Sequence, residues 1–438
     1  MKFRKEEYRN RRIQFMKMVG EGNIAILNAA PEVKRNGSDN HYPYRQDSDF
    51  YYLTGFNEPQ AIAIFIPGRE EGEFILFNRE HDPETAVWQG PMAGQSGACE
   101  HFGADQSFPF TVADEKIPSL IEGCKRLYYS IGRDMSFNRL ILKWFNKVQS
   151  AQRSGGAAPS ELLNIEAILH EMRLIKSPYE IECMRKAGEI SAQAHIDAMK
   201  ACRPGMREYE LEAYLQYGFT KGGSRSPAYP HIVGSGANSC ILHYSQNDDV
   251  VEDGDVVLID AGAEYENYAS DITRTFPANG RFSPEQRAVY QAVLNTQLAV
   301  IDAIKPGVLW QKLQEISEEF ILNELIKIGI LSGDPQALIT QRAWHRFYLH
   351  RFGHWLGLDV HDVGAYKVKG QWRALEPGMV LTVEPGIYIP AHSKDVEERW
   401  WNIGVRIEDD VLVTGSGCEV LSAKAPKTIE AIEGLMAR

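Results

Sequence analysis

Four carboxylates in the C-terminal half of the chain stand in apolar sequence, where an ionised side chain needs a counter-charge. Asp260 ends the run "VVLID", and Asp271 follows just after the polar turn "EYEN". Glu384 ends "VLTVE", and Glu408 lies inside "VRIEDDVLV". Burying an ionised carboxylate is costly unless it is paired with a cation or coordinates a metal. These four residues are therefore candidate metal ligands.

Basic residues near these acids in the sequence are few. Arg274 and Arg406 are the main candidates, and two cations do not neutralise four anions, whereas two divalent metal ions do. Two metal ions about 3.5 to 4 Å apart share a water molecule, lower its pKa and polarise the group that it attacks. The sequence thus predicts a dinuclear centre that hydrolyses its substrate.

A fifth ligand is available in the segment "HRFGHWLGLDVHDVG", residues 350–364. It contains His350, His354 and His361, three of the 12 histidines in the chain. Any one of them alone would more commonly be a packed core residue, but their clustering beside glycines favours a site. Four oxygen donors and one imidazole suit Mn²⁺, Fe²⁺, Co²⁺ or Zn²⁺ better than Ca²⁺ or Mg²⁺. Manganese is the ion that we expect.

Three residues suit the remaining catalytic roles. Glu384 can take a proton from the attacking water as a general base. His243 and His361 can stabilise the oxyanion or the leaving group. His243 lies in "GSGANSCILHY", residues 234–244, which we expect to enter a strand shortly before Asp260. A structural role is the common alternative for such a lone histidine.

An internal repeat positions the acids. In each copy, a Ser-Pro sequence with Glu or Gln at the third helical position predicts a capped helix start. A Pro-Gly turn, a second amphipathic helix and an acidic strand with the pattern G-x-V-[VL]-x-[IV]-[DE]-x-G follow in the same order. We infer two related αα-ββ halves that pack about a pseudo-twofold axis and bring their acids together. The matching segments are 177–180 and 283–286, 203–206 and 305–308, and 253–262 and 376–386.

The two aspartates are predicted to face each other across a hairpin. Paired residue numbers in a hairpin sum to a constant, so a pair of Asp260 with Asp271 places the turn centre between Tyr265 and Glu266. Directly opposed residues have Cβ atoms about 4.5 to 5.5 Å apart. Two like charges at that separation repel, which again requires a cation between them.

The length and composition fit a two-domain globular protein. The chain has 438 residues, more than the roughly 250 to 300 at which one core usually stops growing. Short apolar runs up to about residue 132 have the rhythm of an α/β domain. The small-residue stretch at 152–161 is a plausible loop or linker. We expect an N-terminal domain over 1–173 and a catalytic domain over 174–438.

Charge and cysteine usage exclude several other classes of protein. The net charge of -12 argues against nucleic acid or an anionic membrane surface as a partner. No stretch has the apolar length of a signal peptide or a membrane span, so we expect a cytoplasmic protein. The six cysteines include no C-x-x-C pair, which argues against a zinc ribbon or a thioredoxin-type site.

Several motifs carry a family resemblance. "LIDAG", "SDITRTF", "GHWLGLDVHDVG", "VLTVEPGIY" and "GVRIEDD" resemble the metallopeptidases of the pita-bread fold. Together with "YPYRQDSDFYYLTGFNEP" at 42–59, they make nearly the whole chain similar to the aminopeptidase P family, the Xaa-Pro aminopeptidases. The resemblance implies an α/β N-terminal domain and an α+β pita-bread catalytic domain with a pseudo-twofold repeat. It also implies cleavage of peptides after an N-terminal residue that precedes proline, and a homo-oligomer, either a dimer or a tetramer.

The resemblance also assigns roles to individual residues. It implies that Glu384 activates the water, that His243 and His361 contact the reacting peptide group, and that His350 lines the proline pocket. By motif, the metal ligands fall on Asp260, Asp271, His354, Glu384 and Glu408.

More distant roles follow from the same family pattern. Arg406 would brace a ligand carboxylate, and Tyr388 resembles a tyrosine near the site, although core packing is an equal alternative for it. In the first domain, Asp39, Trp88 and Arg153 would reach the active site of a neighbouring subunit. For these three residues a surface or packing role stays open.

Two other functions remain as alternatives. Prolidase shares the fold and the ligands but cleaves only Xaa-Pro dipeptides. A non-catalytic peptide-binding protein of the same fold would be expected to lose metal ligands, and this chain keeps all five. Creatinase-like chemistry without metal is disfavoured for the same reason.

Overall fold

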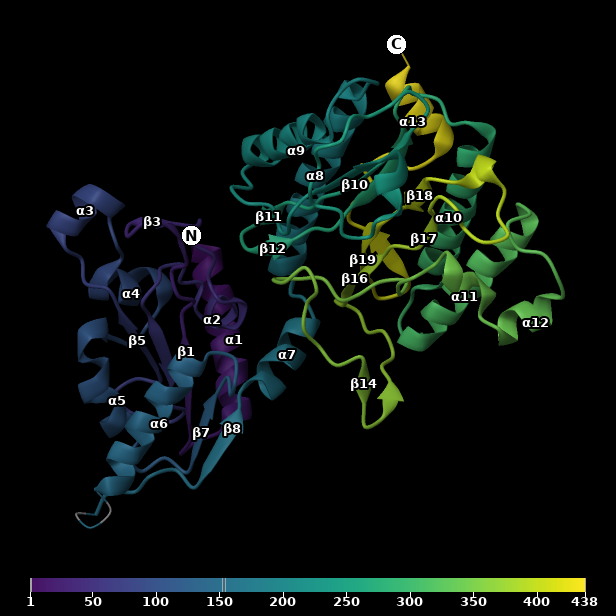
Figure 1. The fold of residues 1–438 in the computed structure, drawn as a ribbon. Helices are drawn as coiled ribbons and strands as arrows, with labels where there is room; N and C mark the ends of the chain where they lie inside the picture. The colour runs from purple at the N-terminus through teal and green to yellow at the C-terminus, as the bar shows by residue number, and fades with distance from the viewer. Residues whose placement is uncertain (1, 152, 154, 438) are drawn as a thin grey trace. The chain divides into compact units, whose positions relative to one another are not determined.

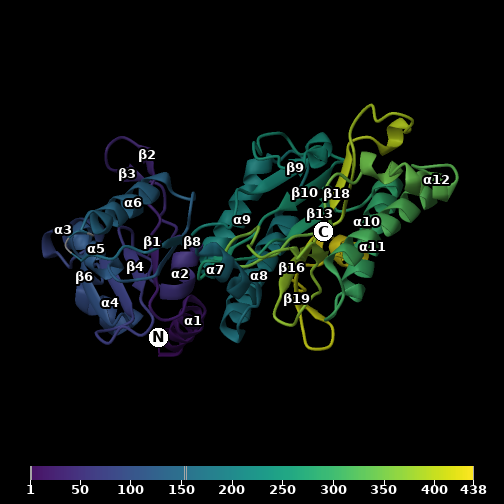
Figure 2. The same cartoon turned by 90° about the horizontal axis from the view of Figure 1, so that it is seen from below.

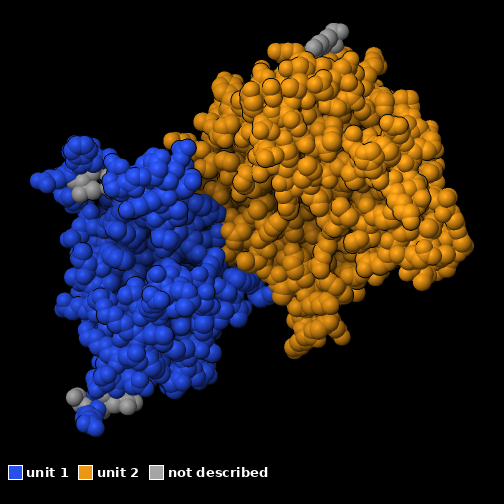
Figure 3. All heavy atoms as spheres, in the orientation of Figure 1, with its two compact units in different colours: residues 1–172 blue, residues 173–438 orange. Residues whose placement is uncertain are grey.

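The two parts of the chain fold around separate hydrophobic cores. The structure is a computed structural model that describes residues 2–151, 153 and 155–437. One unit comprises residues 1–172 and the other residues 173–438 (Figure 3). Within the described residues, none of the helices combines the length and the apolar character that a membrane span requires.

The first unit contains a mixed six-stranded sheet whose central strands are apolar and buried. The strand order is β6-β5-β4-β1-β7-β8, and helices pack on it, with Ile117 of α5 and Trp144 of α6 in the core. The small-residue stretch at 152–161 is a connection inside this unit, since it joins α6 to β8; residues 152 and 154 lie outside the described part. The elements are β1 (Ile24–Asn28), β4 (Ile62–Phe65), β5 (Phe74–Asn78), β6 (Gln106–Pro109), β7 (Arg126–Tyr129), β8 (Glu161–Asn164), α1 (Lys2–Val19), α2 (Ser48–Thr54), α3 (Pro83–Gln89), α4 (Gly94–Phe102), α5 (Ala113–Ile121), α6 (Met135–Ser150) and α7 (Glu166–Leu174).

The two predicted helix starts of the second unit are both present and have the same cap. Helix α8 (Pro178–Ala201) begins after Ser177, whose hydroxyl accepts a hydrogen bond from Glu180 N at 3.3 Å, and the Glu180 carboxylate accepts one from Ser177 N at 3.0 Å. Helix α10 (Pro284–Ala303) begins after Ser283, with equivalent distances of 3.2 and 3.0 Å. Such reciprocal bonds satisfy two backbone donors that a helix start otherwise leaves unpaired.

The rest of the repeat follows in the predicted order. In each half a second helix precedes a strand that a glycine with a left-handed backbone introduces: Gly254 has φ 93° and Gly378 has φ 92°. In Figures 1 and 2 the helix pair α8 and α9 lies on one side of the strands and the pair α10 and α11 on the other. The bounds are α9 (Glu208–Gly222), α11 (Trp310–Lys327), β9 (Ile232–Ser235), β10 (Val256–Asp260), β13 (Thr273–Pro277), β16 (Val380–Val383), β17 (Gly386–Ile389), β18 (Ile403–Arg406), β19 (Asp409–Val413) and β20 (Cys418–Val420). The shorter elements are β11 (Glu264–Tyr265), β12 (Tyr268–Ala269), β14 (Lys367–Val368), β15 (Gln371–Trp372), α12 (Pro335–Thr340) and α13 (Ile429–Met436).

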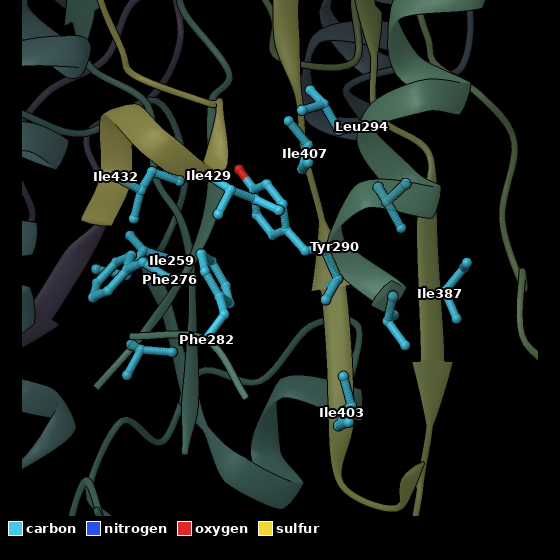
Figure 4. Close-up of a cluster of buried hydrophobic side chains, with 14 of the residues drawn as sticks. Ile259, Phe276, Phe282, Tyr290, Leu294, Ile387, Ile403, Ile407, Ile429 and Ile432 are labelled. Atoms are coloured by element: carbon cyan, nitrogen blue, oxygen red, sulfur yellow. The ribbon is translucent and has the colours of Figure 1, made fainter. Parts of the chain in front are cut away.

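A continuous apolar core holds these strands in place. Figure 4 shows Tyr290 and Leu294 of α10 packed between Ile387 of β17 and Ile429 at the start of α13. The buried hydroxyl of Tyr290 donates to Lys427 O at 2.8 Å, so the core contains no unpaired phenol at this point. Dense packing of this kind fixes the strand ends, and the candidate site lies at those ends.

Candidate active site

The four acids singled out in the sequence all lie where strands of the second unit end or begin. Asp260 is the last residue of β10, and Asp271 lies two residues before β13. Glu384 directly follows β16, and Glu408 lies between β18 and β19. Because both halves of the repeat contribute strands, the acids arrive at one place from opposite sides of the pseudo-twofold arrangement.

The loop that carries His354 is bound to β16 through its backbone. His354 N donates to the Thr382 hydroxyl at 3.0 Å, and Thr382 N donates to His354 O at 2.9 Å. Gly353 permits this close approach, since a Cβ there would lie 2.0 Å from Thr382 O. The ring Nδ1 donates to Trp355 O at 2.9 Å. That bond fixes the ring so that its other nitrogen points toward the acids.

The ligand atoms of the cluster lie at distances that suit a shared metal. His354 Nε2 lies 3.4 Å from Asp271 Oδ2 and 3.5 Å from Glu384 Oε1. Asp271, His354 and Glu408 each offer one ligand atom, and these atoms lie within 4.8 Å of one another. Asp260 joins the same cluster through Tyr229, whose hydroxyl lies within hydrogen-bond distance of both aspartates.

The predicted hairpin register is wrong: the residue opposite Asp260 is two positions later than expected, so the centre of the turn lies one residue later. Asp260 pairs with Thr273, and not with Asp271. The turn is centred between Glu266 and Asn267, which have φ values of 54° and 64°. Two adjacent left-handed residues form the mirror-image turn that matches the twist of a hairpin. The two aspartates are therefore not directly opposed on the ladder, although their carboxylates still meet.

Arginine and lysine provide little compensating charge at the cluster. Asp260 is the one ligand carboxylate with such a partner among the described residues: Arg406 Nη2 donates to its Oδ2 at 2.7 Å. Arg274, the other partner considered from the sequence, binds Asp409 at 2.7 Å, and both side chains are fully buried there. Within the described residues, Asp271, Glu384 and Glu408 form no ion pair with an arginine or a lysine, and the nearby charge of Arg406 only partly offsets the effect of burial on the pKa of Glu384 and Glu408.

The pKa values show how strongly these acids need a cation. Burial raises the pKa of Glu408 well above its ordinary range, and the negative charges of the neighbouring carboxylates raise it further. Burial also raises the pKa of Asp271, and it raises the pKa of Glu384 to about 7 although His354 opposes the shift. Burial alone would lower the pKa of His354, but Asp271 and Glu384 raise it to about 9. The donor set of hard oxygens and one imidazole fits two divalent cations of the first transition series.

Tyr229 and Thr273 are site residues that the sequence patterns did not single out. The Tyr229 hydroxyl lies 2.6 Å from Asp260 Oδ1 and 2.5 Å from Asp271 Oδ1. The Thr273 hydroxyl donates to Glu408 Oε2 at 2.6 Å and accepts from Arg406 Nε at 3.1 Å. Strand alternation from Asp271 would have found Thr273, because residues two apart share a face. No such spacing signal exists for Tyr229, which reaches the site from a separate loop.

Replacing Tyr229 with phenylalanine should weaken metal binding roughly tenfold, as partners that orient metal ligands commonly do when removed. The change leaves two ligand oxygens without their hydroxyl partner and lets both carboxylates turn. Equilibrium dialysis or calorimetry at fixed pH measures the dissociation constant. Tyr290→Phe removes another buried hydroxyl, which is bound to Lys427 O, and serves as the control. Equal metal affinity in both variants would refute an orienting role.

A hydrogen-bonded chain leads from Asp260 to His350. Arg406 Nη1 donates to the Tyr388 hydroxyl at 2.9 Å, and that hydroxyl donates to His350 Nε2 at 2.8 Å. Burial, with Arg406 adding to it, lowers the pKa of His350 to about 4, so the ring is neutral. Its Nδ1 donates to Arg351 O at 2.8 Å. Tyr388 is therefore bound to site residues, in addition to being packed in the core.

The predicted histidine cluster does come together. His350, His354, His361 and Glu384 line one cavity of about 330 Å³, and the rings of His354 and His361 lie edge to face with centroids 4.3 Å apart. His243 is exposed and lies in the loop before β10, and the strand of its segment, β9, comes before it. The expectation that this segment enters a strand is therefore wrong, since it leaves one.

The three first-domain candidates lie apart from this cluster in the chain and are all exposed. Trp88 of α3 is 88% exposed, Asp39 lies in an exposed turn, and Arg153 is exposed at the surface of the first unit. The cavity and the acid cluster are built from the second unit alone. The roles of Asp39, Trp88 and Arg153 in a neighbouring subunit stay predictions.

Comparison with known families identifies two matching models. Residues 182–415 match metallopeptidase family M24, and residues 8–128 match the aminopeptidase P N-terminal domain. Among curated proteins, the chain is 44% identical to the Xaa-Pro aminopeptidase of Escherichia coli over 99% of this chain and 98% of that protein. It is 35% identical to the human Xaa-Pro dipeptidase over 96% of this chain and 90% of the other.

Solved structures agree with these matches. Pseudomonas aeruginosa aminopeptidase PepP superposes with a TM-score of 0.98 at 53% identity, covering 99% of this chain and 98% of that one. A variant of Escherichia coli aminopeptidase P solved with substrate superposes with a TM-score of 0.95 at 43% identity, covering 99% and 98% of the two chains. Both share the two-part architecture across their whole length.

Proposed function

The chain belongs to metallopeptidase family M24, and from that premise we propose that it is an Xaa-Pro aminopeptidase that releases the N-terminal residue from peptides with proline in second place. One observation carries the proposal most strongly: four carboxylates and one imidazole converge from both halves of the repeat, with one arginine to offset them. The family expectation for the fold is confirmed, and the enzyme assignment sets the non-catalytic alternative aside.

Five residues would hold two divalent ions, which we take to be manganese. When bound, such a centre supplies an activated water and polarises the scissile carbonyl. We assign the ligand roles to Asp260, Asp271, His354, Glu384 and Glu408. The charge count supports two ions, because the four carboxylates exceed the single guanidinium of Arg406 by three negative charges.

Protein groups around the centre carry the remaining steps. Glu384 lines the cavity beside the other proposed ligands, so its carboxylate is placed to act as a general base. It accepts the proton of the attacking water and passes it to the leaving nitrogen. His361, at the cavity, and His243 donate hydrogen bonds to the reacting peptide group. A tertiary amide before proline has no N–H of its own, so recognition depends on such groups and on shape.

The proline side chain would pack on His350, which lines the cavity, and the buried Tyr388 supports this wall from behind through its hydroxyl. Arg406 fixes this wall, because it binds both the Tyr388 hydroxyl and Asp260. The wall and the ligand set are thus linked by one guanidinium. A homo-oligomer in which Asp39, Trp88 and Arg153 reach a neighbouring site, the absence of nucleic-acid and membrane partners, and a cytoplasmic location stay predictions.

Substrate length separates this function from prolidase, which remains the second candidate because the human dipeptidase is similar over most of the chain. Manganese-loaded enzyme should release the first residue of Arg-Pro-Pro, with the products followed by chromatography. Protein treated with a chelator is the control and should be inactive. Cleavage restricted to Xaa-Pro dipeptides would reassign the chain to prolidase.

A further inference from the structure

A buried acid of the second unit, Glu208, lies outside the metal cluster. It is the first residue of α9, and it is 0% exposed. Within the described residues, neither an arginine nor a lysine forms an ion pair with it. A buried carboxylate is costly unless a cation or hydrogen bonds compensate it. The hydrogen bonds of Glu208 therefore indicate its role.

The hydrogen bonds that this carboxylate accepts come from one segment, residues 235–249. Its Oε1 accepts from Ser235 N at 2.7 Å, from Ser235 Oγ at 2.8 Å and from Asn238 Nδ2 at 3.2 Å. Its Oε2 accepts from the Tyr244 hydroxyl at 2.8 Å and from Asp249 N at 3.1 Å. One carboxylate thus joins the start, the middle and the end of the same loop.

His243 belongs to this loop and lies near the cavity. Burial lowers the pKa of His361, which lines the cavity, and the neighbouring imidazoles of His354 and His243 lower it further. Between residues 241 and 249 the buried side chains are Tyr244 and Asn247, whereas His243 is exposed. The position of the His243 ring therefore depends on the two buried residues that follow it.

Both of these buried residues are bound to the same face of α9. The Tyr244 hydroxyl donates to Glu208, and its ring belongs to an apolar cluster that includes Tyr388. Asn247 Nδ2 donates to Glu212 Oε2 at 3.1 Å. Residues four apart on a helix are neighbours on its surface, so Glu208 and Glu212 together hold the part of the loop that carries His243.

We propose that Glu208 is a positioning residue for the reaction, which fixes the loop 235–249 so that the imidazole of His243 reaches the reacting peptide group. The inference rests on the proposed function, which assigns that contact to His243. Glu208 does not line the cavity, so it acts through Tyr244 and the loop backbone. A misplacement of about 1 Å can cost about a hundredfold in rate, so a loop that shifts loses catalysis without loss of the fold.

Hydrogen-bond chemistry explains why an acid stands at this position. A carboxylate accepts on both oxygens, whereas a glutamine side chain accepts on its oxygen and donates from its nitrogen. Glutamine at 208 keeps the bonds from Ser235 or those from Tyr244 and Asp249, and not both sets. The backbone bond from Glu208 N to Asp249 O, 3.0 Å long, remains. Glu208→Gln is thus a change of nearly equal shape that releases only side-chain contacts to the loop.

A double-mutant cycle separates positioning from support of the fold. Glu208→Gln and Tyr244→Phe are each made in the wild type and in His243→Ala, and the metal-loaded proteins are assayed with Arg-Pro-Pro. Tyr244→Phe keeps the ring and removes the hydroxyl, which also lies 3.4 Å from Asp248 Oδ1. Glu210→Gln is the matched control, because Glu210 is exposed in the same helical turn and glutamine also forms its capping bond.

We expect Glu208→Gln and Tyr244→Phe to lower kcat roughly tenfold, with KM changed less than about twofold. In the His243→Ala background the same changes should have almost no further effect on kcat, because residues that act through one another are not additive. In metal-free protein, amide hydrogen exchange of residues 241–249 should become faster in both variants, since the loop opens more readily. Glu210→Gln should match the wild type in both measurements.

The remaining outcomes overturn the proposal or a stated part of it. An equal loss of kcat with and without His243 would mean that Glu208 supports only the fold, and unchanged kcat in both single variants would remove its role altogether. If Glu208→Gln does not fold, Tyr244→Phe decides alone. His243→Ala with wild-type kcat overturns the roles of both His243 and Glu208. A wild type that cleaves only Xaa-Pro dipeptides overturns the aminopeptidase function instead, and the same cycle measured with Ala-Pro then decides on Glu208.

Discussion

Replacing Glu384 with glutamine should lower kcat about a thousandfold, since loss of a positioned general base commonly costs between about a hundredfold and ten-thousandfold. Glutamine keeps an oxygen that can approach a metal, but its amide does not accept a proton from water near neutral pH. Substrate binding depends on other groups as well, such as His350 at the cavity. The KM for Arg-Pro-Pro should therefore change by much less than kcat.

Metal content distinguishes the loss of a base from the loss of a ligand. Mass spectrometry of native Glu384→Gln protein should show bound manganese under conditions that saturate the wild type. Glu376→Gln is the control, because Glu376 is exposed at the start of the same segment and should leave kcat unchanged. A Glu384→Gln enzyme that contains full metal and retains a tenth of wild-type kcat would exclude this residue as the base.

The repeated framework was predictable because its signals are local. A Ser-Pro start with an acid or amide at the third helical position specifies the same capping box twice, and both boxes are present. Each glycine before an acidic strand has the left-handed backbone that its turn needs. Such signals depend on a few neighbouring residues, so they can be read without knowledge of the rest of the fold.

The acids of "EDD" show where local reading ends. Glu408, Asp409 and Asp410 are consecutive, and the structure gives them three different environments. Glu408 faces the cluster, Asp409 binds Arg274 and Lys427 at 2.7 Å each, and Asp410 accepts from Asp271 N at 3.1 Å. Arg274 and Asp271 lie more than a hundred residues away in the sequence, and Lys427 lies in a loop 18 residues after Asp409, so charge spacing alone does not assign these partners. Glu408 was singled out by its apolar neighbours and then by the family motif, because charge alone does not separate it from Asp409 and Asp410.

Turn type and loop placement set the other limits. The hairpin register depends on Glu266 and Asn267 both adopting positive φ, and a polar stretch such as "EYEN" permits the turn one residue earlier. Tyr229 reaches Asp260 and Asp271 from a loop 31 and 42 residues away in sequence. Nothing in its own neighbourhood marks it. Positions fixed by tertiary packing therefore had to come from the structure.

In the metal-free enzyme the free energy of unfolding should fall as pH rises. In the metal-free protein the pKa of Glu384 is raised from 4.5 to about 7, chiefly by burial, and that of His354 is raised from 6.5 to about 9 by Asp271 and Glu384 against the effect of burial. The folded state then binds more protons than the unfolded state, so the free energy of unfolding falls as pH rises. His195 and His350 have pKa values lowered to about 4, mainly by burial, and they act oppositely below pH 6.5. Above pH 6.5 these two histidines no longer oppose the cluster, and the variant His354→Gln separates the cluster from thiols such as Cys124 and Cys240, whose pKa burial raises to about 11.

Urea unfolding of the wild type between pH 6.5 and 9, in chelator and in excess manganese, measures this effect. In chelator the free energy of unfolding should decline across the interval, and His354→Gln should reduce the decline. Metal ions need the same ligands deprotonated, so manganese binds more tightly as pH rises, and an ion at a hundred times its dissociation constant adds about 2.7 kcal/mol. The gain from manganese should thus grow with pH. A metal-free protein whose stability rises over this interval would mean that protein groups already balance the acids, and the case for a dinuclear centre would fail on charge.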